Sequence, residues 1–134
     1  MPSHIVVFKI VFLLKLVHLV NSKYSCVFII VNNFFLRKQF TGMAIWPFIV
    51  VRNAQLRKDK VFINHERIHL RQQLELLILP FYIWYILEFT VHWIRYGNRY
   101  DAYRSISFEK EAYSNENDLG YLTHRPFWSF LKYL

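Results

Sequence analysis

Two histidines four residues apart, with a glutamate directly after the first, are the residues of this sequence whose types and spacing can do chemistry. They stand in the order His65-Glu66-Arg67-Ile68-His69. On a helix, His65 and His69 lie on one face, one turn apart, and can present two imidazole nitrogens to one tetrahedral zinc ion. Glu66 then projects beside the metal, where it can take a proton from a zinc-activated water and pass it to a leaving amine. The segment therefore predicts a zinc site with Glu66 as general base.

A catalytic zinc ion usually has three protein ligands, so a third must come from elsewhere in the chain. Cys26 is the only cysteine, which excludes a cysteine cluster and leaves a carboxylate. The stretch Phe108-Glu109-Lys110-Glu111-Ala112-Tyr113 falls on a predicted helix. Ala112 shares a face with Glu109 and is small enough to let that helix pack closely against the histidine helix. We expect Glu109 to be the third ligand. Glu111 is the alternative, unless it pairs with Arg104 or Lys110 on the surface.

The order of these motifs, H-E-x-x-H, then an apolar helix, then E-x-x-A, resembles that of the gluzincin zinc metallopeptidases. Within that group it is most similar to the peptidase domain of bacterial β-lactam-sensing receptors and to the CaaX-prenyl-type peptidases, over about residues 43–117. The resemblance implies a short, stand-alone peptidase in which His65, His69 and Glu109 bind zinc and Glu66 is the base. It also implies that an edge strand before the zinc helix, here Met43–Val51, pairs with the backbone of a peptide or protein substrate.

The sequence departs from that family at the residue after the alanine, which is usually acidic. Here it is Tyr113, so another group must orient a zinc-binding imidazole, and the candidates are Tyr113 itself, Asn115 and Glu116. Catalysis also needs an electrophilic group near the developing oxyanion. Four side chains are available for that role, and the sequence favours none of them: Tyr103, Tyr113, Tyr121 and His124.

The apolar patterning predicts the elements that position these residues. Residues 27–36 and 43–51 are rich in strand-forming types and flank Thr41-Gly42, which predicts a β-hairpin with its tip there. Pro47 favours an edge position for the second strand. Helices are expected from about Lys58–Lys60 to Leu79, where Pro80 ends or kinks the first, then over 81–96 with a stop at Gly97-Asn98, over about 100–117, and briefly within 123–134. The predicted class is α+β, mainly helical, with a short β-hairpin or small sheet before the histidine helix.

Length and composition indicate one domain. The chain has 134 residues, of which 54% are hydrophobic, enough to bury a core. We expect a single metallopeptidase-like domain over residues 24–134, after an apolar lead-in over residues 1–23 that is either amphipathic or disordered. The formal charge is +8, but the basic residues are scattered and no recognition motif accompanies them, so we expect no nucleic-acid partner.

A membrane surface is harder to dismiss as a partner. Thirteen Phe, nine Tyr and four Trp accompany the basic residues, a composition that a lipid headgroup region accommodates, so the expected location is cytoplasmic or membrane-associated. Residues 5–20 are short for a span, carry charges and lack a signal-peptide cleavage site. Residues 74–96 contain Pro80, Glu88 and His92, which favours a core or interfacial helix over a span. For the aromatic stretch Phe81–Trp93 we expect a buried helix face rather than lipid contact.

The sequence therefore favours a zinc-dependent metallopeptidase-like protein that hydrolyses peptide bonds. One alternative is a non-catalytic, zinc-stabilised structural or interaction protein. Another is a basic, aromatic membrane-surface protein in which the motif is a coincidence. If the motif has no metal, His69 and its neighbours Arg67, Arg71 and Glu75 would lie on an exposed, solvated helix.

Overall fold

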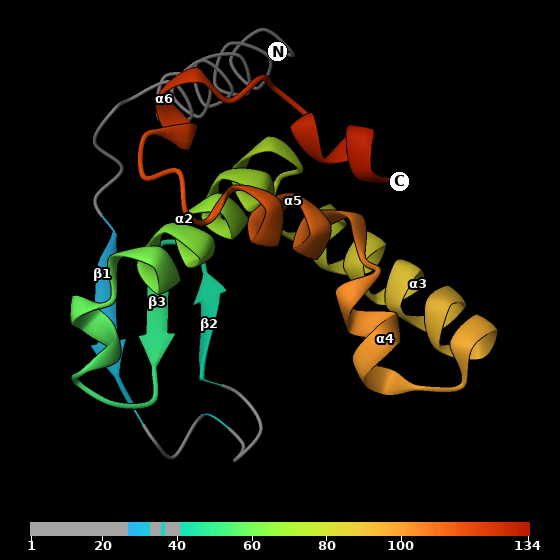
Figure 1. The fold of residues 1–134 in the computed structure, drawn as a ribbon, viewed down its shortest axis with the longest axis horizontal. Helices are drawn as coiled ribbons and strands as arrows, with labels where there is room; N and C mark the ends of the chain where they lie inside the picture. The colour runs from blue at the N-terminus through green and yellow to red at the C-terminus, as the bar shows by residue number, and fades with distance from the viewer. Residues whose placement is uncertain (1–26, 33–35, 37–40) are drawn as a thin grey trace, which may run out of the picture.

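The computed structural model describes residues 27–32, 36 and 41–134, so the predicted lead-in of residues 1–23 lies outside the described residues. In the described part a small sheet precedes a run of helices, which confirms the predicted α+β, mainly helical class (Figure 1). The strands are β1 (Phe28–Val31), β2 (Gly42–Ile45) and β3 (Phe48–Val51). They are followed by η1 (Leu56–Lys58), α2 (Lys60–Glu75), α3 (Leu79–Tyr96), α4 (Arg99–Arg104), α5 (Ser107–Asn115), α6 (Tyr121–His124) and η2 (Ser129–Tyr133).

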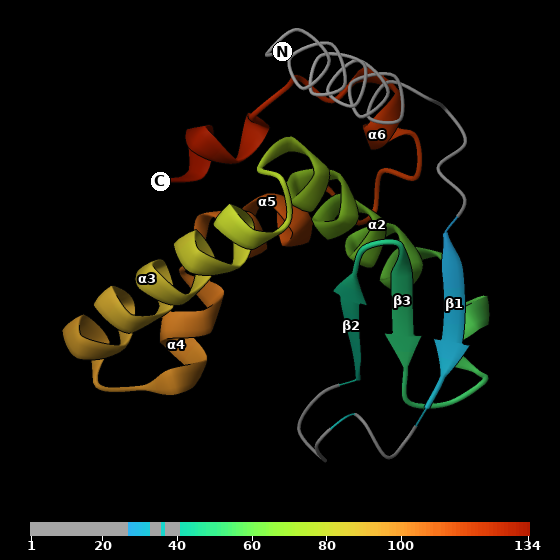
Figure 2. The ribbon, with the colours of Figure 1, turned by 180° about the vertical axis from the view of Figure 1, so that it is seen from behind.

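The sheet has the strand order β1-β3-β2, so β3 lies in the middle. It pairs with β1 in parallel and with β2 antiparallel. Side chains alternate along β3, and Ile49 and Val51 are fully buried on the face that α2 covers. Figure 2 shows α2 lying across this sheet from behind. The histidine helix α2 thus packs directly on one face of the sheet.

The hairpin forms at a different place from the predicted one. Trp46-Pro47 makes the turn between β2 and β3, and Gly42, expected at the hairpin tip, begins β2. The predicted strand over 43–51 is therefore two strands, and the prediction of a tip at Thr41-Gly42 was wrong. The reason lies in Pro47, which has no backbone N–H for a ladder and a fixed φ that suits a turn.

The histidine helix, α2, begins where the sequence predicts, because Asp59 caps it. The Asp59 carboxylate accepts hydrogen bonds from the backbone amides of Val61 and Phe62, at 3.1 and 3.0 Å. The helix ends at Glu75 rather than at Leu79, since Leu77 and Ile78 take positive φ values of 61° and 55°. Pro80 does not end α2. It stands in the first turn of α3, where its missing N–H leaves no helical hydrogen bond unmade.

Gly97 ends α3 as predicted, in the left-handed conformation with φ 68°. The expected single helix over 100–117 is instead α4 and α5, with a break before Ser107. Glu88 of α3 holds that break, because its carboxylate accepts from the Ser107 backbone amide at 2.6 Å and from the Ser107 hydroxyl at 2.8 Å. In the tail, the short helix expected within 123–134 is the 3-10 helix η2.

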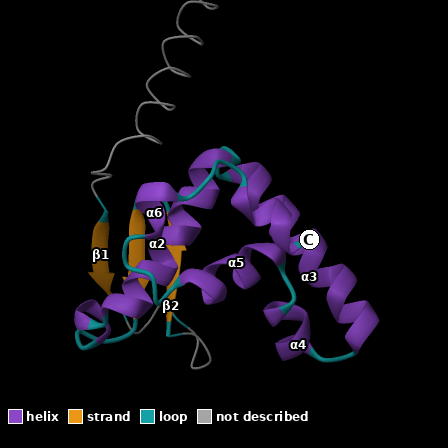
Figure 3. Cartoon of the chain, turned by 45° about the horizontal axis from the view of Figure 1, so that its top comes forward, coloured by secondary structure: helices purple, strands orange, loops and turns teal. Residues whose placement is uncertain are grey.

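α5 packs against α2 on the side away from the sheet, and Figure 3 shows the two helices between the sheet on one side and α3 with α4 on the other. Ala112 of α5 is fully buried and clusters with Ile68 of α2. A small residue at that position lets the two helices approach, as the sequence indicates. A second core cluster consists of Phe81, Ile106, Phe108 and Phe130.

α3 is only partly a buried helix. Phe81 is buried, and Tyr82, Trp84, Tyr85 and Phe89 pack against the core from the same side. The aromatic side chains thus form the buried face that was expected within Phe81–Trp93, whereas the aliphatic residues between them are exposed on the other face.

Among the described residues, no single helix combines the length and hydropathy of a membrane span. α2 and α3 meet that test only as a pair, and the chain bends by 113° where they join.

Candidate metal centre

His65 and His69 lie on one face of α2 and point their Nε2 atoms at each other, 3.1 Å apart. Both side chains are buried, with 6% and 7% of their surface exposed. Ile68 and Leu70 of the same helix are buried too, and anchor it against the α5 and sheet sides. The alternative of a solvated helix is therefore wrong for His69 and for Glu75, both of which are buried.

Glu109 of α5 completes the group. Its Oε2 lies 3.4 Å from Nε2 of His65, and its Oε1 lies 3.4 Å from Nε2 of His69. One ligand atom from each of the three residues falls within 4.8 Å of the others, an arrangement that can hold a metal ion. The structure thus brings together His65 and His69 of α2 and Glu109 of α5, the three residues that the sequence predicts as ligands.

Glu111, the alternative ligand, faces away from the histidines. Both of its oxygens accept hydrogen bonds from Arg125, from Nε at 2.5 Å and from Nη2 at 3.0 Å. Tyr121 adds a third, from its hydroxyl at 2.9 Å. Glu111 is therefore part of a buried ion pair and pairs with neither Arg104 nor Lys110.

The spacing of the two imidazole nitrogens is close to that of two ligands of a tetrahedral metal ion. With metal–ligand distances of about 2.0–2.1 Å, tetrahedral geometry separates two ligand atoms by about 3.3 Å. The two nitrogens are 3.1 Å apart, and each lies 3.4 Å from a different oxygen of Glu109, His65 from Oε2 and His69 from Oε1. Two nitrogen lone pairs this close repel unless a proton or a cation lies between them, so the group is arranged around a positive charge.

The outer nitrogen of each imidazole has an acceptor partner that sets its tautomer. Nδ1 of His65 lies 2.8 Å from the carboxylate of Glu116, one of the three candidates that the sequence offered. Asn64 fixes the loop that carries Glu116, donating to the backbone carbonyls of Glu116 and Asp118 at 2.9 Å each. The carboxylate requires a proton on Nδ1, which leaves the Nε2 lone pair of His65 free for a metal.

Gln72 does the same for His69. Its amide nitrogen donates to the carbonyl of Phe108 at 3.1 Å and to Glu111 at 3.0 Å, and both of those partners can only accept. The Gln72 oxygen must then face Nδ1 of His69, 2.8 Å away, so that Nδ1 is the donor and Nε2 carries the lone pair. The orientation of one buried amide therefore sets the tautomer of His69.

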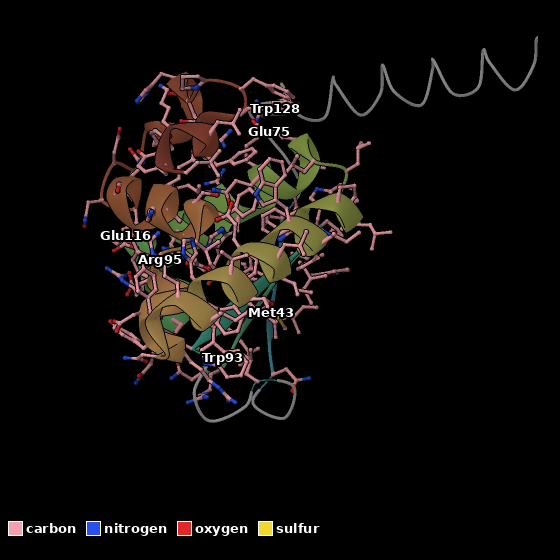
Figure 4. All side chains as sticks on the ribbon, turned by 90° about the vertical axis from the view of Figure 1, so that its right-hand side faces the viewer. Met43, Glu75, Trp93, Arg95, Glu116 and Trp128 are labelled. Atoms are coloured by element: carbon pink, nitrogen blue, oxygen red, sulfur yellow. The ribbon has the colours of Figure 1, made fainter. Side chains whose placement is uncertain are left out.

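Arg125 binds Glu111, the acceptor of the Gln72 amide, and so supports the orientation of Gln72. It pairs with Glu111 and also with Glu75 at the end of α2, and all three side chains are at most 1% exposed. Glu75 accepts in addition from the backbone amide of Trp128 at 3.2 Å (Figure 4). A buried carboxylate pair needs such a cation, because two unpaired buried charges would be strongly unfavourable. The cluster joins α2, α5 and the tail behind Gln72.

Two tyrosine hydroxyls hold Glu109 in place. Tyr85 of α3 donates to Oε1 at 2.7 Å, and Tyr103 of α4 donates to Oε2 at 2.9 Å. Each oxygen of Glu109 thus faces one tyrosine and one histidine. Burial, together with the Glu109 charge, raises the pKa of both phenols well above the usual range, so they stay protonated donors.

The charges within the group are strongly coupled. Burial alone would lower the pKa of His69, but Glu109, Glu66 and Gln72 together outweigh burial and raise the pKa to about 9. Burial works against ionisation of Glu109, yet His69, His65 and Tyr85 hold its pKa far below the usual range. Without a metal, the pair is an imidazolium and a carboxylate, and a metal cation can take the place of the proton.

Glu66 lies beside the three ligands without being one of them. It is 6% exposed, and burial raises the pKa of its carboxyl, while the nearby His69 and His65 oppose the rise. The backbone amide of Ala44 in β2 faces this carboxylate and stabilises its charged form. A carboxylate with a raised pKa next to a metal position can accept a proton from water near neutral pH.

The candidates for an oxyanion-stabilising group divide between the site and its surroundings. The ring of Tyr113 contacts the His65 ring edge to face with centroids 4.5 Å apart, and its hydroxyl lies 3.1 Å from that of Tyr103. Both tyrosines are therefore at the site. Tyr121 belongs to the Glu111 cluster, and His124 is exposed and lies 3.4 Å from Asp118.

Side chains already bond to part of the outer edge of β2, the edge that does not pair with β3. The Ala44 carbonyl accepts from Nε2 of Gln73 at 2.9 Å and from the hydroxyl of Tyr82 at 3.0 Å. A carbonyl with two donors has both lone pairs in use. An extended substrate could therefore pair with this edge only after displacing one of these side chains, or further along, at Gly42.

Sequence reasoning missed Gln72, Tyr85 and the Arg125 cluster. For Gln72 a signal was present, since it follows His69 by three residues and so shares its helix face. Tyr85 is one of nine tyrosines, and nothing in the sequence distinguishes it before the course of α3 is known. Arg125 lies in the tail, and its partners become apparent only from the fold.

Comparison with protein-family models, with curated proteins and with solved structures gave no match in any of the three. The evidence for this site is therefore its geometry: a buried group of His65, His69 and Glu109 that can hold a metal ion, with Glu66 beside it.

Proposed function

We propose that the protein is a zinc-dependent metallopeptidase-like hydrolase. The observation that carries the proposal is the convergence of two imidazole Nε2 atoms, 3.1 Å apart, and the buried Glu109 carboxylate, with Glu66 adjacent. Two nitrogens and one carboxylate oxygen are the donor set of many catalytic zinc sites. The order of the motifs, which resembles that of gluzincins, supports the same conclusion.

Zinc held by these residues would act as a Lewis acid. It would polarise the carbonyl group of the substrate and lower the pKa of a bound water toward neutral pH. The chain supplies the proton transfers. Glu66 takes a proton from the attacking water, which its raised pKa favours, and delivers it to the departing amine. Tyr113, whose ring contacts His65, is the candidate donor to negative charge on the substrate oxygen, because Tyr103 already gives its one hydroxyl proton to Glu109.

Replacement of the base tests the catalytic part of the proposal. Glu66→Gln should keep zinc bound while peptide cleavage falls by about two to four orders of magnitude, the usual contribution of a general base. Arg67→Gln changes the next residue, which is exposed, and should cleave like the parent. If the zinc-loaded parent and Glu66→Gln cleave a peptide library equally, the catalytic assignment is wrong.

A second candidate is a zinc-stabilised structural or interaction protein without turnover. Its support is the closure of the site: His65, Glu66, His69 and Glu109 are exposed by 6%, 6%, 7% and 3%, and the Ala44 carbonyl is already bonded. Such burial restricts the access of a substrate to a metal ion held there. In that case zinc removal should lower the melting temperature of a parent that cleaves nothing in the library, and His65→Ala should reproduce the loss of stability.

A further inference from the structure

One face of α3 is apolar and turned away from the protein. Six aliphatic side chains on it are between 54% and 81% exposed, and at 100° per residue they fall within an arc of about 140°. Thr90 lies in the same arc, and its hydroxyl is bonded to the carbonyl of Ile86. The arc contains no charged residue. We call these residues the α3 apolar face: Leu79, Ile83, Ile86, Leu87, Val91 and Ile94.

The packing of α3 explains why this face is left uncovered. Its opposite side holds Phe81 and Tyr85 against Phe108 of α5, with ring centroids 4.7 and 6.3 Å apart. Glu88 also turns inward to Ser107. Figure 1 shows α3 reaching away from the sheet, with α4 folded back along it. The helix therefore packs its aromatic groups on one side and presents aliphatic groups, with Thr90 among them, on the other.

A hollow of about 510 Å³ runs along the edge of this face. Its apolar lining comes from Pro80, Ile83, Leu87 and Val91 of α3 and from Leu134 at the end of the chain. Glu88, which also borders it, has its carboxylate engaged by Trp84 and Ser107. The hollow is thus a mainly apolar groove, with His92 and Ser105 as the other polar residues of its lining.

Aromatic and basic residues stand together at the far end of the helix. Arg99 lies over the ring of Trp93 at 4.6 Å, and Arg95 lies over that of Tyr96 at 5.6 Å. Trp93 and Arg95 are labelled in Figure 4. Trp and Tyr beside Arg are typical of the boundary between lipid headgroups and acyl chains. This end of α3 carries the chemistry of that boundary.

We propose that the α3 apolar face docks on an anionic lipid bilayer, with α3 lying in the plane of the surface. Its 18 residues extend for about 27 Å and would place the aliphatic side chains among the acyl chains, with Arg95 and Arg99 at the phosphates. The charge favours lipid over a second copy of the chain. Two copies with a formal charge of +8 each would repel, and the nearby Asp101 is already bonded by Asn98.

The test is flotation of the full-length protein with vesicles of phosphatidylcholine and phosphatidylglycerol at 3:1, compared with phosphatidylcholine alone. Ile86→Asn with Ile94→Asn removes two exposed aliphatic groups, and each should lower the partition coefficient by about tenfold or more. Leu119→Asn, which is 54% exposed between α5 and α6, is the matched control and should float like the parent. Arg95→Gln with Arg99→Gln should reduce binding to the anionic vesicles by about tenfold or more, and high salt should do the same.

Three results would overturn the proposal. The parent could fail to float with the anionic vesicles. The double isoleucine variant could float as well as the parent, which would assign binding to another part of the chain, such as residues 5–20, that every variant retains. The parent could instead be a dimer that does not bind vesicles and that the isoleucine substitutions dissociate. The α3 apolar face would then bind a second copy of the chain. Circular dichroism of each variant would show that its helices are intact. None of these outcomes depends on metal or on peptide cleavage.

Discussion

The hydroxyl of Tyr85 donates a 2.7 Å hydrogen bond to Oε1 of Glu109, the same oxygen that lies 3.4 Å from Nε2 of His69. A residue of α3 therefore aims a carboxylate of α5 at a histidine of α2. The candidate metal centre therefore also joins these three helices.

Removal of that hydroxyl should weaken metal binding without abolishing it. Tyr85→Phe takes away one hydrogen bond to a charged group, which contributes about 1.5–3 kcal/mol, so zinc affinity should fall by about ten- to a hundredfold. Chelator competition measures the change. Tyr82→Phe, one turn earlier on the same helix, loses its bond to the Ala44 carbonyl instead and should keep the parent affinity. Equal losses of zinc affinity in the two variants would show that the effect comes from weaker packing of α3 and not from the hydrogen bond to Glu109.

The two neighbouring buried glutamines make a second matched pair. Gln72→Leu removes the acceptor on Nδ1 of His69 and should lower zinc affinity by about ten- to a hundredfold, the usual effect of losing an outer partner of a ligand. Gln73→Leu is equally buried, but its partners are Ala44 and Trp46, so it should lose stability and keep its zinc affinity. An unchanged affinity in Gln72→Leu would contradict the role of this amide in setting the tautomer.

The Arg125 cluster should dominate the stability of the tail. Arg125→Ala leaves Glu111 buried without a cation and leaves Glu75 with only the partly exposed Arg71, 3.5 Å away, so the free energy of unfolding should fall by about 3–5 kcal/mol in urea titrations. Arg67→Ala, on the exposed side of α2, should change it by less than about 0.5 kcal/mol. A small effect at Arg125 would mean that water reaches the two carboxylates.

The metal-free protein should lose stability as the pH rises. The pKa of His69 is about 9 in the folded chain and about 6.5 when unfolded, so its protonation stabilises the fold fully below pH 6.5. That contribution declines between about pH 6.5 and 9, as His69 gives up its proton in the folded state. Urea unfolding in the presence of a chelator, across this range, measures it. His69→Gln should flatten the profile, and a parent profile that is already flat would contradict the His69–Glu109 coupling.

Zinc should displace the same proton. At pH 7 the folded, metal-free chain holds His69 protonated, so binding should release about one proton for each zinc ion. Titration of zinc in two buffers of different ionisation enthalpy gives this number. A binding reaction that releases no proton at pH 7 would contradict the high pKa of His69.

The local features of the fold could be predicted from the sequence. The spacing of His65 and His69 indicated their shared face, and Gly97 the end of α3, because both depend on residues close together in the chain. The hairpin prediction was wrong at Pro47, since one proline is compatible with both a turn and an edge strand until its partners are known.

The site was predictable in part for the same reason. Glu109 was identified from the pattern of its neighbours, and Ala112 indicated the close approach of the helix that carries it. Tyr85 and Arg125 act through contacts with residues far away in sequence, 24 positions for Tyr85 and Glu109 and 50 for Arg125 and Glu75. Only the packing of the helices reveals such pairs.

Metal analysis of the full-length protein, purified without chelators, tests the metal centre most directly. We predict about one zinc ion per chain in the parent and none in His65→Ala with His69→Ala, whereas Glu111→Gln, which alters the buried cluster and no ligand, should retain its zinc. A parent that is folded and binds no zinc when titrated, or a double histidine variant that binds as much as the parent, would contradict the assignment of His65, His69 and Glu109 as ligands.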